Sequence, residues 1–198
     1  MTGYHKINPF NCYIDNLWFL NAATLVFALG VFSGAFSLRY LNSDHLHYYS
    51  NIISAYIGSP SISGQNILRT SFQYNLFFYL ILFCCGFFYW GYLVSFLLLV
   101  CYGASIGFSV GLLVLLLGLK GFILAVFSIL PHNILLIPAL LFIVVNSVTF
   151  SLSRRTKTRI TGYNYLSKMF ALSVLVLLAC LIESSITPVF VNWIINFL

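Results

Sequence analysis

Long apolar segments alternate with short polar ones along most of the chain, and their lengths predict membrane-spanning helices. A helix needs about 20 apolar residues to cross a hydrocarbon core about 30 Å thick. We therefore expect a single membrane domain, an all-α polytopic integral membrane protein with five transmembrane helices. The predicted segments are spans at 17–38, 71–91, 94–117, 121–150 and 169–190, an outer polar segment at 39–70 and a basic inner loop at 151–168.

The composition supports this class. Hydrophobic residues make up 61% of the 198 residues and charged residues only 6%, whereas about a quarter of a soluble domain is charged. Residues 70–119 contain no Asp, Glu, Lys, Arg or His. The apolar segment 17–38 is too long for the core of a secretory signal peptide, so we expect it to remain as an anchor.

The outer polar segment contains a predicted amphipathic helix over residues 43–57, with Ser43 as its N-cap. Its apolar positions recur at i, i+3, i+7 and i+10: Leu46, Tyr49, Ile53 and Tyr56. Such a helix lies on a membrane surface. Its apolar side either rests on lipid or receives a partner, and Tyr49, Ile53 and Tyr56 are the candidate partner surface.

Glycines recur every four residues at two places in the apolar segments. Gly103, Gly107 and Gly111 share one face of a predicted span, and Gly30 and Gly34 share a face of the first. Small residues at this spacing let two membrane helices approach almost backbone to backbone. These glycines predict close helix packing, either within the chain or between copies in a homo-oligomer.

The fourth span is predicted to be broken. A straight helix over 121–150 would be about 45 Å long, longer than the hydrocarbon core needs, and each of Pro131 and Pro138 removes a backbone hydrogen bond. A kinked or partly unwound span accommodates both facts, with His132 and Asn133 available to bond the freed carbonyls. A re-entrant hairpin is the competing geometry.

The distribution of basic residues favours five spans with the N-terminus inside and the C-terminus outside. The inner side then holds Lys6, Arg154, Arg155, Lys157, Arg159 and Lys168, and the outer side Arg39, Arg69 and Lys120. This satisfies the positive-inside rule, whereas a re-entrant fourth element would place the basic loop outside. The predicted surface helix is then extracytoplasmic. A basic cluster beside an apolar span also contacts anionic lipid, so we expect no nucleic-acid partner.

Glu183 is an acidic residue inside the last predicted span. It lies fifteen residues after Lys168, roughly 22 Å at 1.5 Å per residue, in the outer third of the hydrocarbon core. An acid at this depth needs a proton or a partner. It either holds the last span to His132, Asn133 or a helix N-terminus, or it serves ion or proton transport. The structural role is favoured, because one acid makes no relay.

No catalytic pattern is present. The chain lacks G-x-S-x-G, H-E-x-x-H and a phosphate-binding glycine loop, and its five cysteines include no C-x-x-C pair. Asp44, His45 and His47 lie close together in the sequence, but residues at i and i+2, such as His45 and His47, point apart on a helix, which argues against a metal site. We expect no catalytic, cofactor-binding or metal site, and a protein that is not an enzyme.

Four stretches of sequence resemble the stage II sporulation protein M family, in order and from about residue 20 to the C-terminus. The most specific is GLKGFILAVFSILPHNILLIPAL at Gly118–Leu140. The others are FALGVFSGA at Phe27–Ala35, GFSVGLL at Gly107–Leu113 and ESSITP at Glu183–Pro188.

The resemblance implies a role in endospore formation, when the mother-cell membrane engulfs the forespore. It implies a membrane scaffold that anchors and localises peptidoglycan hydrolases, the stage II sporulation proteins D and P, at the septal and engulfing mother-cell membrane. The alternative function is a small membrane permease or channel that uses the broken fourth span and Glu183.

Overall fold

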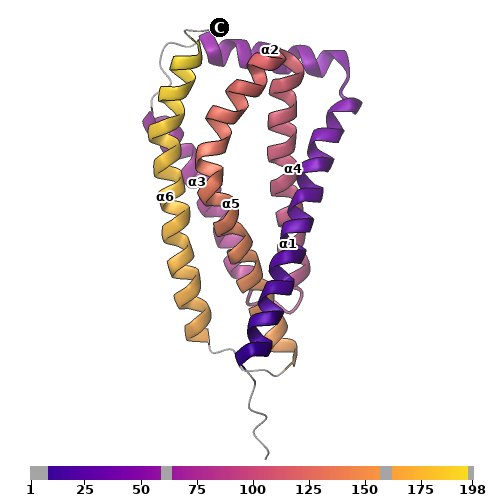
Figure 1. Ribbon diagram of the computed structural model, residues 1–198, viewed down its shortest axis with the longest axis vertical. Coiled ribbons are helices and arrows are strands. Elements are labelled where there is room, and N and C mark those ends of the chain that lie inside the picture. The colour runs from indigo at the N-terminus through magenta and orange to yellow at the C-terminus, as the bar shows by residue number, and fades with distance from the viewer. Residues whose placement is uncertain (1–8, 59–63, 157–161, 196–198) are drawn as a thin grey trace, which may run out of the picture.

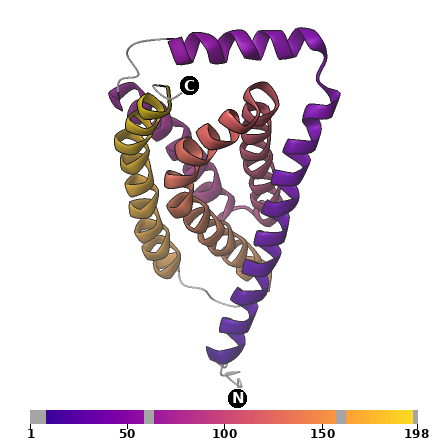
Figure 2. The ribbon, with the colours of Figure 1, turned by 45° about the horizontal axis from the view of Figure 1, so that its top comes forward.

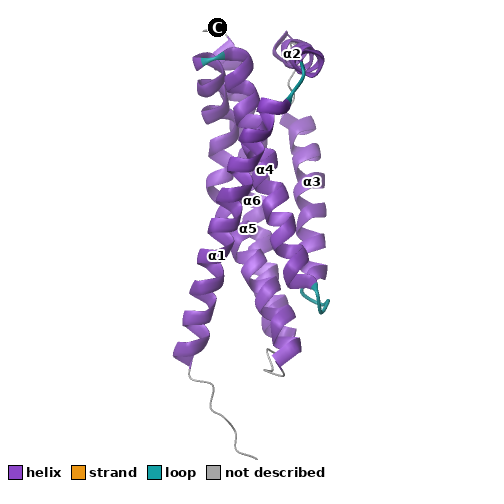
Figure 3. Cartoon of the chain, turned by 90° about the vertical axis from the view of Figure 1, so that its right-hand side faces the viewer, coloured by secondary structure: helices purple, strands orange, loops and turns teal. Residues whose placement is uncertain are grey.

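The computed structural model describes residues 9–58, 64–156 and 162–195, which form six α-helices and one short 3₁₀-helix. In order these are α1 (Pro9–Ser37), η1 (Leu38–Tyr40), α2 (Ser43–Gly58), α3 (Gly64–Cys85), α4 (Gly91–Leu117), α5 (Leu119–Thr156) and α6 (Gly162–Ile195). Helices α1, α3, α4, α5 and α6 run lengthwise in one bundle, and α2 lies across one end of it (Figure 1). The loop between α3 and α4 lies at the other end (Figure 3).

Within these ranges, four helical segments are long and apolar enough to cross a membrane: Leu17–Tyr40, Gly91–Leu117, Leu119–Ser153 and Gly162–Ser185. Helix α3 runs beside them but is not one of the four. Its first twelve residues include Arg69, Gln73 and Asn75. The chain is therefore an all-helical multi-pass membrane protein.

The helices extend beyond the apolar segments that predicted them. Helix α1 begins at Pro9 and not at 17, α6 begins at Gly162 and not at 169, and α3 covers Gly64–Cys85 and not 71–91. The physical reason is that hydropathy marks only the part of a helix that suits lipid, while the backbone hydrogen bonds continue into polar flanks. The turn expected near Gly91 comes just before it, since α4 starts at that residue.

The fourth predicted span is bent and not broken. Helix α5 keeps its helical assignment from Leu119 to Thr156 with both Pro131 and Pro138 inside it, and Figure 2 shows the bend. A proline lacks the N–H for one backbone bond and its ring crowds the preceding turn, which kinks a helix. Near the first proline, the Asn133 side chain donates a 2.8 Å hydrogen bond to the carbonyl of Ile129.

The two glycine series face each other across α1 and α4, which pack side by side (Figure 1). A methyl group added at Gly30 would come within 2.5 Å of the carbonyl oxygen of Val100, and one at Gly103 within 2.6 Å of that of Phe27. Added Cβ atoms at Gly34 and Gly107 would also collide with the backbone of the opposite helix, and one at Gly111 with the side chain of Leu38 in η1. The contact between α1 and α4 is therefore made largely by backbone atoms.

Side chains of α5 and α6 bond backbone carbonyls at the C-terminal end of α3 and in the loop that follows it. Ser147 of α5 donates to the carbonyl of Leu82 at 2.9 Å, and Ser151 donates to that of Phe88 at 2.7 Å. Tyr165 of α6 donates to the carbonyl of Phe83 at 2.8 Å. The last carbonyls of a helix have no partner within it, so these bonds fix the position of α3 within the bundle.

Candidate functional site

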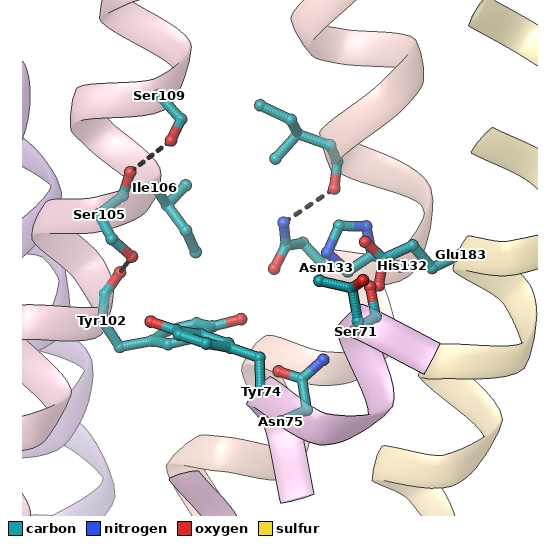
Figure 4. A pocket seen from close by; sticks show the side chains of 12 residues that line it. Ser71, Tyr74, Asn75, Tyr102, Ser105, Ile106, Ser109, His132, Asn133 and Glu183 are labelled. Carbon is teal, nitrogen blue, oxygen red and sulfur yellow. Dashed lines mark hydrogen bonds between the residues drawn. The ribbon is translucent and has the colours of Figure 1, made fainter. Parts of the chain in front are cut away.

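A polar cavity of about 300 Å³ lies among α3, α4, α5 and α6 (Figure 4). Polar side chains from all four helices line it, with two isoleucines: Thr70, Ser71, Tyr74, Asn75, Tyr102, Ser105, Ile106, Ser109, Ile129, His132, Asn133 and Glu183. Such groups inside an apolar bundle are costly unless they have partners, so they mark candidate functional positions.

Helical periodicity brings the cavity residues of α4 to one face. Tyr102, Ser105 and Ser109 follow one another at i, i+3 and i+7, the spacing of one side of a helix. On α5, His132 and Asn133 come directly after Pro131, inside the bent helix. Glu183 reaches the same cavity from α6 (Figure 4).

Several donors that line the cavity are already engaged, two of them on their own helix. Ser105 donates to the carbonyl of Tyr102 and Ser109 to that of Ser105, both at 2.8 Å (Figure 4). The amide nitrogen of Asn75 contacts the sulfur of Cys180 at 3.6 Å. Because these protons are used, the serine oxygens remain available as acceptors.

Three buried polar atoms of the cavity have no hydrogen-bond partner among the residues that the structure describes. They are Nδ1 of His132, Oδ1 of Asn133 and Oε2 of Glu183. Asn133 is only 6% exposed. Buried polar atoms in proteins are nearly always paired, with protein atoms or with a bound molecule. The cavity therefore has unused capacity to accept hydrogen bonds.

Glu183 comes close to the partners that the sequence suggested for it. His132 and Asn133 line the same cavity, and an electrostatic interaction links Glu183 with His132. The described residues nevertheless form no ion pair with the carboxylate. The arrangement joins α5 and α6 through a shared cavity and not through a direct salt bridge.

The cavity residues of α3 and α4 were not predicted from the sequence. Tyr74 and Asn75 are neighbours on α3, and Tyr102, Ser105 and Ser109 occur singly along α4, as polar residues often do in membrane helices. Their helical spacing was the available signal, but it does not indicate which neighbouring helix the face meets. Across the described ranges, no group of three or more His, Cys, Asp or Glu could hold a metal ion.

The other predicted positions lie away from the cavity. Tyr49 of α2 packs edge to face against Phe108 of α4, with ring centroids 5.8 Å apart. Ile53 is half-buried, and the side chain of Tyr56 lies outside the described residues. The structure thus turns Tyr49 toward the bundle, while Tyr48 and Ile52 on the same helix are exposed.

Comparison with known protein families shows to which family the chain belongs. A sequence model described as stage II sporulation protein M matches residues 23–188, which is most of the chain. The chain belongs to the stage II sporulation protein M family. The resemblance inferred from the four motifs is confirmed, and this family member is a sporulation membrane protein. No curated protein and no solved structure matches it.

Proposed function

We propose that this member of the stage II sporulation protein M family is a membrane scaffold that anchors and localises peptidoglycan hydrolases. Its proposed partners are stage II sporulation proteins D and P, and its proposed site is the septal and engulfing mother-cell membrane. The observation that carries the proposal is the family match over residues 23–188. A bundle in which α1 and α4 pack through backbone contacts, with a helix across one end, suits a holding role.

We also propose five spans with the N-terminus inside and the C-terminus outside. In this arrangement α3 crosses the membrane with the four more apolar helices, since it runs lengthwise beside them (Figure 3). The basic cluster between Arg154 and Lys168 then lies inside, as the positive-inside rule favours. Helix α2 lies on the outer face, where the cell wall and its hydrolases are.

The outward side of α2 is the proposed docking surface. Tyr49 packs against Phe108. Tyr48 and Ile52, one turn apart on the same helix, are 62% and 46% exposed. Aromatic and aliphatic side chains at i and i+4 form a continuous apolar strip on a helix. We therefore add Tyr48 and Ile52 to the surface predicted from Tyr49, Ile53 and Tyr56.

Affinity purification from sporulating cells tests this surface. The double variant Tyr48→Ser, Ile52→Ser should lose co-purification of the hydrolases while its amount in the membrane stays normal. Tyr163→Ser, at an exposed tyrosine near the start of α6, is the matched control and should retain them. Normal co-purification and normal engulfment in the double variant would refute the docking surface.

A second measurement tests the holding role itself. Purified protein reconstituted alone in vesicles should neither cleave peptidoglycan nor move solutes across the membrane. Either activity, lost on substitution of cavity residues, would replace the scaffold proposal with an enzyme or a permease.

A further inference from the structure

The cavity among α3, α4, α5 and α6 contains two buried side-chain oxygens that accept no hydrogen bond from the described residues. Oδ1 of Asn133 and Oε2 of Glu183 are buried and unpartnered among the described residues, and the hydroxyl protons of Ser105 and Ser109 are already donated to carbonyls. A molecule that lies against these two oxygens must therefore bring donors. Its charge is constrained too, because no Lys or Arg lines the cavity.

We propose that this cavity binds a ligand with a protonated amine, which lies against Glu183 and donates to the Asn133 side chain. The proposal goes beyond the scaffold function and does not depend on it. A carboxylate buried in an apolar bundle requires a compensating charge or a proton. A primary ammonium group supplies one positive charge and three donors in one small group.

Aromatic rings favour an organic ammonium over a metal cation. Tyr74 of α3 and Tyr102 of α4 line the cavity with Glu183 (Figure 4), and ring faces attract ammonium groups. Hard metal cations instead need several oxygens at roughly 2.0–2.6 Å around one point. The acceptors here come from separate helices around about 300 Å³, a volume at the lower end for small-molecule sites.

The amine can come from a free molecule or from a phosphatidylethanolamine headgroup. Tyr74, Ser105 and Ser109 line the cavity and are exposed, so the cavity is open to the outside of the bundle. Both sources present the same ammonium chemistry to Glu183, and the membrane composition separates them experimentally.

The test uses the full-length protein in nanodiscs of phosphatidylglycerol, which has no amine. Thermal unfolding is followed with added ethanolamine, with sodium chloride at equal ionic strength, and in discs that contain phosphatidylethanolamine. We expect ethanolamine, phosphatidylethanolamine or both to raise Tm in a concentration-dependent manner, and sodium chloride not to. A response only to the lipid identifies the headgroup as the source, and a response to ethanolamine identifies the free amine.

Two variants assign the effect to the cavity. Glu183→Gln keeps the side-chain shape and should weaken binding by about tenfold or more. Asp44→Asn removes an exposed carboxylate on α2 and should bind like the unmodified protein. If Glu183→Gln does not assemble, Ile106→Phe, which reduces the cavity volume and keeps every polar group, should also weaken binding.

The proposal is overturned if no amine changes Tm in either membrane, or if sodium chloride changes it equally. It is also overturned if the assembled variants Glu183→Gln and Ile106→Phe respond as strongly as Asp44→Asn does.

Discussion

The hydroxyl group of Tyr165 donates a 2.8 Å hydrogen bond to the carbonyl oxygen of Phe83. The same tyrosine ring stacks on Phe150, with centroids 4.2 Å apart and planes 9° from parallel. Tyr165 thereby joins α6 to both α3 and α5. The bond also needs Gly86, where an added Cβ would come within 2.6 Å of the Tyr165 ring.

Removal of that hydroxyl should destabilise the bundle modestly. In Tyr165→Phe the ring stack remains but the Phe83 carbonyl loses its donor, so we expect a loss of about 1 kcal/mol in the free energy of unfolding. Unfolding in mixed micelles measures it, with Tyr163→Phe at an exposed position as control. Equal stability of the two variants would show that the bond contributes nothing.

A methyl group in the glycine contact should separate α1 from α4. In Gly107→Ala the new Cβ would collide with the backbone of Val31, and relief of the overlap should reduce stability by about 1–3 kcal/mol. Gly162→Ala is the matched control, because nothing lies within 4 Å of an added Cβ there. If Gly107→Ala unfolds like the control, the backbone contact is looser than the structure implies.

Replacement of the prolines should straighten α5. Spin labels at Leu119 and Phe142, both exposed on this helix, report the distance between its first half and its middle in a cysteine-free background. Pro131→Ala should lengthen that distance, because the missing backbone bond and the ring clash are the local causes of bending. The same measurement on Pro138→Ala gives the contribution of the second proline to the bend. An unchanged distance in both variants would assign the bend to packing by neighbouring helices.

Loss of one tyrosine should release α2 from the bundle. Tyr49→Ala removes the ring that packs against Phe108, so amide hydrogens of α2 should exchange faster with deuterium. Tyr48→Ala removes an exposed ring from the same helix and should leave exchange nearly unchanged. Similar exchange in the two variants would mean that other contacts hold α2.

The sequence predicted the features that depend on local spacing. The four-residue repeats at Gly30 and Gly103 indicated two closely packed helices, and the structure places them against each other. The depth of Glu183 and the position of His132 beside a proline suggested that they meet in the bundle, and both line one cavity. In each case the membrane limited the possible arrangements: closely packed helices need small residues, and polar groups at this depth need partners.

Features that depend on which helices are neighbours were not predictable. Ser147 was an ordinary small residue of an apolar span, yet it bonds the carbonyl of Leu82, 65 positions away in the chain. Tyr49 lay on the predicted apolar side of the surface helix, but whether that side met lipid or protein depended on the position of Phe108 of α4. The break expected at Pro131 and Pro138 became a bend, because the remaining backbone bonds continue the helix around both rings.

The contacts between the glycine faces of α1 and α4 fix the position of one helix along the other. Side chains that interdigitate can rearrange and let helices slide, but peptide groups in direct contact have no such freedom. A bilayer that thickens or thins therefore cannot shift α4 along α1. The position of α2 relative to these two helices is set by this protein and not by the membrane around it.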